Sequence, residues 1–153
     1  MLSHTYKESV ALLAADVNHA TFRGWRAEGV IPGLQPGDLD LKTLLIIALA
    51  KELSAAGLPK SVFGRIATAT VNVLVAQPDE LTNLLHAPQH ELRRSPLMLL
   101  VWRDAAGVYQ SVTVRQANLA GVRQYAALSL GDILGPVVRS AGEYAADLDR
   151  GAA

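Results

Sequence analysis

The chain has 153 residues, half of them hydrophobic and 18% charged, so it can form packed cores and is not a disordered tail. Its formal net charge is zero, which excludes a general positive field, so any binding to nucleic acid must come from the placement of a few cations. The absence of cysteine excludes disulfides, thiolate catalysis and cysteine-ligated zinc.

The first two predicted elements are short helices joined by a tight turn. Residues 6–15 carry apolar side chains at helical spacing, and a second helix follows over residues 19–28 after a turn at 16–18. The apolar face of the first segment consists of Tyr6, Val10, Leu13, Ala14 and Val17. Two helices in this arrangement, the second carrying arginines, are typical of a helix-turn-helix.

The ends of the second helix are marked by residues with known end preferences. Asn18 or Thr21 can cap its start with a side-chain oxygen. Gly29 ends it, and Pro32 prevents it from resuming. The residues that follow, 30–38, are rich in proline and glycine and predict a short connector rather than a full wing.

The second helix is predicted to have an apolar face and a basic face. Phe22 and Trp25 share one face because they stand three residues apart, which predicts a core role for the tryptophan. Arg23 and Arg26 share the adjacent face by the same spacing. In a helix-turn-helix these arginines contact DNA phosphates or bases, and the alternative is an ordinary solvated face.

A strong helix is predicted over residues 41–56, with Asp38 or Asp40 as its cap and Gly57 at its end. It is apolar around most of its girth, which predicts burial on more than one side. Its longest apolar run, Leu44 to Ala50, is far short of the roughly 20 residues that a membrane helix needs. Nothing at the N-terminus resembles a signal peptide, so we expect a soluble, cytoplasmic protein without a membrane segment.

Two further helices are predicted before a linker. The first begins at Pro59 and runs to about Ala76, although the alternating valines in residues 70–75 also fit a strand. The second is one or two turns over residues 79–85, whose leucines can face a partner. The polar, proline-containing segment 87–96 then predicts a linker.

The C-terminal third predicts a small α+β module. Residues 97–103 are apolar and favour a strand, and the alternating pattern over 108–115 predicts the second strand of a hairpin. A third strand is expected over residues 124–130. A closing helix is expected from a cap at Asp132 to about Leu148.

We find no pattern that predicts catalysis or a cofactor. There is no glycine-rich phosphate loop, and the histidines have no partners that would form a catalytic triad. His86, His90 and Glu91 could be considered as metal ligands, but Pro88 disfavours the regular helix that would bring the two histidines together. We therefore expect no enzyme activity, no cofactor and no metal.

The segment from Thr21 to Pro32 resembles the MerR-type helix-turn-helix family. That family has a Thr-apolar-Arg sequence, an aromatic residue, and a Gly-apolar-apolar-Pro ending of the recognition helix. The matching residues here are Thr21, Phe22, Arg23, Trp25, Gly29, Val30, Ile31 and Pro32. The following helix, with its glycine at 57, is also similar, so the resemblance covers roughly residues 5–70. Phage excisionases and related small DNA-binding proteins show a looser similarity.

This resemblance implies a DNA-binding head, a dimer and a separate C-terminal module, and the predicted helices and strands give an α+β fold class. The expected domains are a MerR-like head with a truncated wing over 1–86, a linker over 87–96, and an effector or interaction module over 97–149. The head would bind double-stranded DNA as a homodimer, and the module would bind a small molecule or a protein. The residues expected at the DNA, by contact or by bracing the helix that makes contact, are Asn18, His19, Thr21, Arg23, Trp25 and Arg26.

A second class of function remains open from the sequence. The head could be a degenerate helix-turn-helix that binds or sequesters another regulator and touches no DNA. The zero net charge and the apolar helix over 41–56 favour this alternative.

Overall fold

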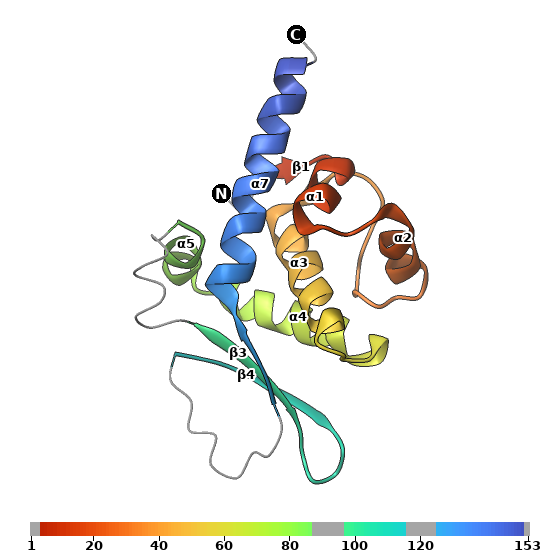
Figure 1. Cartoon of the computed structure of the whole chain (residues 1–153), viewed down its shortest axis with the longest axis vertical. Helices are drawn as coiled ribbons and strands as arrows, with labels where there is room; N and C mark the ends of the chain where they lie inside the picture. Colours follow the sequence, from red (N-terminus) through yellow and green to blue (C-terminus); the bar gives the residue numbers. More distant parts are fainter. Residues whose placement is uncertain (1–3, 87–96, 116–124, 152–153) are drawn as a thin grey trace.

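The computed structural model describes residues 4–86, 97–115 and 125–151, and the linker predicted at 87–96 lies outside them. The described part contains six helices and two antiparallel sheets, which confirms the α+β class (Figure 1). The helices are α1 (Glu8–Ala15), α2 (His19–Ala27), α3 (Leu41–Ala55), α4 (Lys60–Val75), α5 (Pro78–His86) and α7 (Leu130–Gly151). The strands are β1 (Thr5–Tyr6), β2 (Leu39–Asp40), β3 (Met98–Arg103), β4 (Tyr109–Val114) and β5 (Tyr125–Ser129).

The turn between α1 and α2 is fixed at both of its ends. Asp16 adopts the left-handed conformation, with φ of 55°, and ends α1. The Asn18 side chain accepts a hydrogen bond of 2.7 Å from the amide of Thr21, which confirms Asn18 as the cap of α2. After α2 the chain turns at Gly29, whose φ of 65° favours glycine. These local signals set the direction in which α2 leaves α1.

The sequence reading of residues 6–15 as one helix was wrong at its start. Tyr6 lies in β1, which pairs antiparallel with β2 in a ladder that joins Thr5 to Asp40 and Tyr6 to Leu39. Strands of two residues are too short to show an alternating pattern, and Tyr6 happens to fit the helical spacing. The Tyr6 side chain is buried, and this burial raises the pKa of its hydroxyl.

Helix α3 lies at the centre of the fold and packs against α1, α4 and α7. Its predicted extent is confirmed, and Asp40 caps it through a 2.8 Å hydrogen bond from the amide of Thr43. Nine of its residues are buried, which accounts for the absence of a single apolar stripe. The helical interpretation of residues 70–75 is also confirmed, because α4 continues to Val75.

A close approach of two backbones joins α4 to the segment after α2. Gly64 of α4 faces Val30, and a Cβ at position 64 would lie 1.8 Å from the Val30 carbonyl oxygen. Only a glycine therefore allows α4 to pack at this distance. This contact fixes the segment that follows α2 against the body of the protein.

The C-terminal sheet has the order β4-β3-β5, and all of its pairs are antiparallel. The predicted hairpin is confirmed, and Asp104 holds its turn by accepting hydrogen bonds from the amides of Ala106 and Val108. The pKa of Asp104 is lowered, first by the hydrogen bond from the Gln110 side chain and then by the one from the Val108 amide. Through Leu99 the inner face of the sheet joins the core of the helices.

The closing helix begins earlier than expected, so Asp132 is not its cap. Strand β5 runs directly into α7 at Leu130, whose amide donates a hydrogen bond to the carbonyl of Leu97. Asp132 instead stands in the first turn, and Pro136 lies inside the helix. The direct junction leaves no turn in which a cap could form.

Helix α7, at the C-terminal end of the chain, packs against helices from the N-terminal part. It packs against α1, α3 and α5, and its buried residues Leu130, Leu134 and Ala141 belong to the same hydrophobic core as the N-terminal helices. Its C-terminal half extends past α1 and away from the sheet (Figure 1). No helix in the described ranges is both long and apolar enough to cross a membrane.

Candidate functional site

The inner face of α2 holds this helix on the body of the protein. Phe22 is fully buried, and Trp25 is only 5% exposed. The Trp25 ring lies 5.4 Å from the ring of Phe63 on α4, with the two planes tilted by 59°. Trp25 therefore braces α2 rather than facing solvent, and its contribution to any interface is to orient the helix.

The outer face of α2 is small and polar. Thr21 and Arg23 are both exposed, on different sides of the helix because they stand two residues apart. Gly24, which follows Arg23, is partly exposed. Ala20 and Ala27 are exposed on the same helix. In the part of the chain that the structure describes, no carboxylate lies within 4 Å of Arg23. Arg23 is thus the cation that α2 offers to a partner without first breaking an ion pair.

Arg26 is held by two groups of the protein. Its Nη1 atom lies 3.6 Å from Oε1 of Glu8 on α1, and its guanidinium stacks 5.5 Å from the centre of the Phe22 ring. The other carboxylate oxygen of Glu8 lies 3.9 Å from Nδ1 of His19. Glu8 Oε1 is buried and has no hydrogen bond within the described residues. Glu8 therefore neutralises part of the basic surface of α2.

The two residues at the start of α2 differ in how free they are. The side chain of Asn18 is committed to the helix cap, so its carbonyl oxygen already has a donor. The side chain of His19 is 59% exposed and makes only a long contact to Glu8. Of the six residues expected at the DNA, the structure thus presents Thr21, Arg23 and His19 openly. Asn18 caps α2, Trp25 is buried, and Arg26 is paired with Glu8.

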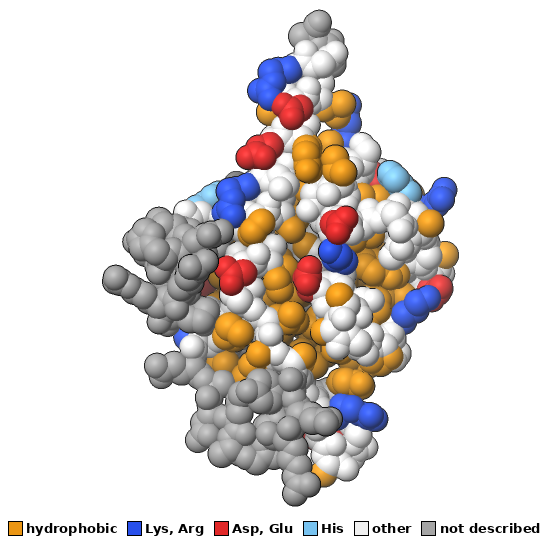
Figure 2. Space-filling model, viewed as in Figure 1, with side chains coloured by type: hydrophobic (Ala, Val, Ile, Leu, Met, Phe, Trp, Pro, Cys, Tyr) orange, Lys and Arg blue, Asp and Glu red, His pale blue; other side chains and the backbone are white. Residues whose placement is uncertain are grey.

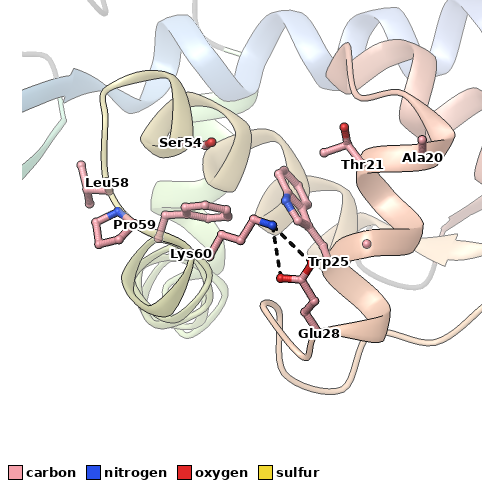
Figure 3. A pocket seen from close by; sticks show the side chains of 10 residues that line it. Ala20, Thr21, Trp25, Glu28, Ser54, Leu58, Pro59 and Lys60 are labelled. Carbon is pink, nitrogen blue, oxygen red and sulfur yellow. Dashed lines mark hydrogen bonds and ion pairs between the residues drawn. The ribbon is translucent and has the colours of Figure 1, made fainter.

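A cavity of about 640 Å³ lies between α2 and the first turn of α4 (Figure 3). Trp25 and Phe63 line it, and Lys60 bridges its edge to Glu28 with Nζ–oxygen distances of 3.2 and 3.3 Å. The two aromatic side chains are only 5% and 2% exposed, so a small molecule would find little apolar surface to cover. The cavity is an open groove beside α2, and Gly24 is one of the residues that line it.

The basic side chains do not form a continuous field. Figure 2 shows Lys and Arg separated from one another and interleaved with acidic side chains on the face that it displays. Within residues 4–86, 97–115 and 125–151, no three metal-ligating side chains come together. The arrangement offers a few separately placed cations on α2, namely His19, Arg23 and Arg26.

A second exposed surface lies on the projecting half of α7. Tyr144 is 37% exposed and Leu148 is 41% exposed, one turn apart on the same side of the helix. They continue the helical spacing of the buried Ala141, so the apolar stripe that packs on the body runs on past it.

The sequence reasoning missed Glu8, Gly24 and this stripe. The stripe was visible as helical spacing in the last turns of the predicted helix. Glu8 gave no sequence signal, because its pairing with Arg26 depends on the angle at which α1 and α2 cross.

No protein-family model matches this chain, and no curated protein matches it. The functional assignment therefore rests on the surface of α2 and on the way the body of the protein holds it.

Proposed function

We propose that this chain is a MerR-like, sequence-specific DNA-binding transcription regulator that acts as a dimer, with α2 as its recognition helix. The observation that carries the proposal is the division of α2 into two faces. Phe22 and Trp25 fix the helix on the body, while Arg23 is open to solvent on the side away from the body and Thr21 is exposed on the flank beside the groove. A helix held in this way can enter the major groove, which is about 12 Å wide.

The contacts expected from α2 are few. Arg23 would bind a phosphate or the edge of a guanine, and Thr21 and His19 would contact the backbone beside it. Each phosphate contact adds about 0.9 to the slope of log affinity against log salt. A single head with so few cations would bind weakly, so the proposal requires two heads on one duplex.

The projecting half of α7 supports the dimer. An exposed helical extension gains little from its own hydrogen bonds, and helices in proteins are stabilised mainly by the burial of their apolar face. Tyr144 and Leu148 leave that face uncovered in the single chain. We infer that a second copy of α7 covers it. In sedimentation, the parent should be a dimer, and Leu148→Glu should shift it to monomer without loss of helix content by circular dichroism.

The test of DNA binding begins with selection of duplexes from a random pool by the full chain. The affinity of the enriched duplex is then measured between about 50 and 200 mM salt. Arg23→Ala should weaken binding by about tenfold, which corresponds to about 1.4 kcal/mol, and lower the salt slope by about 0.9 per head. Arg139→Ala is the matched control, because it removes a positive charge that is also exposed from a different helix, α7. An unchanged affinity for the Arg23 variant would refute the assignment of α2.

The second candidate is an interaction module that binds another regulator and no DNA. The zero net charge and the pairing of Arg26 with Glu8 favour it. A mobility shift on mixed-sequence duplex at about 50 mM salt separates the two, because non-specific binding is almost entirely electrostatic. A head that has lost DNA binding should give no shift under these conditions.

A further inference from the structure

The carboxylate of Glu8 on α1 faces two side chains of α2. Its Oε1 atom lies 3.6 Å from Nη1 of Arg26, and its Oε2 atom lies 3.9 Å from Nδ1 of His19. Residues 19 and 26 stand two turns apart on nearly the same side of α2, so one carboxylate can serve both. A guanidinium is always charged, whereas an imidazole gains its charge as the pH falls through the neutral range. Glu8 thus faces one permanent cation and one conditional cation.

Glu8 depends on these cations because of where its carboxylate lies. The Oε1 atom is buried and accepts no hydrogen bond from the described residues. A carboxylate oxygen withdrawn from water without a donor is costly unless a positive charge lies near it. While the imidazole of His19 is neutral, Arg26 is the one cation within 4 Å of Glu8 in the described ranges. Moving Arg26 to a DNA phosphate would then leave Glu8 without a cation.

The surroundings of His19 leave its charge to be set by Glu8 and by the solvent. Its side chain is 59% exposed, and across the residues that the structure describes Glu8 is the one carboxylate within 4 Å of it. Arg23 stands one turn along the same face of α2, so a charged His19 would lie in line with the cation expected at the DNA. The lysines on the other helices beside α2 are paired with other carboxylates: Lys51 of α3 with Asp16, and Lys60 of α4 with Glu28.

We propose that Glu8, His19 and Arg26 form a pH-dependent switch that sets how many cations α2 offers to the DNA. This inference rests on the proposed function, because it concerns the same helix. With a neutral His19, Glu8 holds Arg26. When His19 takes a proton from the solvent, the imidazolium supplies the positive charge that Glu8 needs, and Arg26 can leave for a phosphate. Protonation is favoured at low pH, so the affinity for duplex rises as the pH falls.

The first test is the pH dependence of binding to the duplex that the parent enriches. The range from about pH 8 to about pH 6 covers the titration of imidazoles and lies above that of ordinary carboxyl groups. At constant salt, the affinity of the parent should rise about fivefold across this range, and its salt slope should steepen. His19→Gln should remove most of this rise. His4→Gln is the matched control, because it removes an imidazole that packs on Tyr6 and lies outside α2, and it should keep the rise.

The second test asks whether Glu8 and Arg26 take part in the switch. At about pH 8, Glu8→Gln should raise the affinity about threefold in the parent and leave it unchanged in an Arg26→Ala background. At about pH 6 this coupling should shrink to less than about 1.5-fold, because the imidazolium already compensates Glu8. In a His19→Gln background the coupling should be the same at both pH values, a result that a merely structural role of His19 would not produce.

The outcomes separate this inference from the function on which it rests. If the parent selects a duplex but binds it equally at both pH values, or if the coupling does not change with pH, the switch is overturned and the proposed function stands. A parent that binds no duplex at about 50 mM salt and about pH 6 overturns both.

Discussion

Helices α2 and α4 pack together through Trp25 and Phe63, and each contains one glycine, Gly24 in α2 and Gly64 in α4. The surroundings of these two glycines differ. The glycine of α4 is explained inside the molecule, because the Val30 carbonyl lies where its side chain would be. The glycine of α2 has empty space around it. Packing thus explains the glycine of α4, whereas no contact among the described residues explains the glycine of α2. Variants on the two helices should show how much each helix contributes to stability and to DNA binding.

The largest effect is expected where the two helices meet. Trp25→Ala should lower the free energy of unfolding by roughly 3 kcal/mol, because it leaves a cavity against Phe63 and removes a ring contact. Chemical denaturation followed by circular dichroism measures this change. Because α2 would lose its brace, DNA binding should fall as well.

Lys60→Met is the control for this contact, since it removes the ion pair between Lys60 of α4 and Glu28, the residue that follows α2. The Lys60–Glu28 pair is more than half exposed on both sides, so its loss should cost less than about 1 kcal/mol. If the two variants unfold alike, the aromatic pair does not hold α2 on α4.

A smaller effect on stability is expected at Gly64. Gly64→Ala places a methyl group against the Val30 backbone, which cannot rotate away as a side chain could. We expect a loss of about 1–3 kcal/mol from the forced separation of α4 and the segment after α2. Denaturant midpoints at an unchanged m-value would measure it. Gly142→Ala on α7, where a Cβ would meet no atom within 4 Å, should change stability in the opposite direction, and a stabilised Gly64 variant would contradict the packing described for α4.

The elements with local signals were predictable, and those that depend on distant partners were not. Asn18 and Asp40 cap their helices through amides three residues ahead, so sequence spacing alone identifies them. The pairing of β1 with β2 joins residues more than thirty positions apart through two residues each, and no local pattern reports it. The start of α7 at Leu130 was misplaced because the Leu97 carbonyl satisfies its amide across the sheet.

The candidate site also has features that local sequence predicts and features that depend on distant partners. The two faces of α2 follow from helical spacing, which correctly placed Phe22 and Trp25 together inside. The freedom of Arg23 and the restraint on Arg26 could not be predicted, because Glu8 reaches Arg26 only once α1 and α2 have packed. The open space at Gly24 likewise becomes visible only when every neighbouring element is in position.

The smallest effect is expected from removing the negative charge of Glu8, which pairs with Arg26. Glu8→Gln keeps the shape of the side chain and removes the charge that faces Arg26 at 3.6 Å and His19 at 3.9 Å. Arg26 would then be available to a phosphate, so the affinity for duplex at low salt should rise about threefold and the salt slope should steepen.

A double-mutant cycle shows whether the gain in affinity for duplex depends on Arg26. In an Arg26→Ala background, Glu8→Gln should have little effect, because the cation that it releases is absent. Glu28→Gln changes the net charge equally at the other end of α2, where the partner is Lys60. Equal gains from both glutamine variants would mean that only the overall field has changed, and Glu8 would then have no special part in setting which cations of α2 reach the DNA.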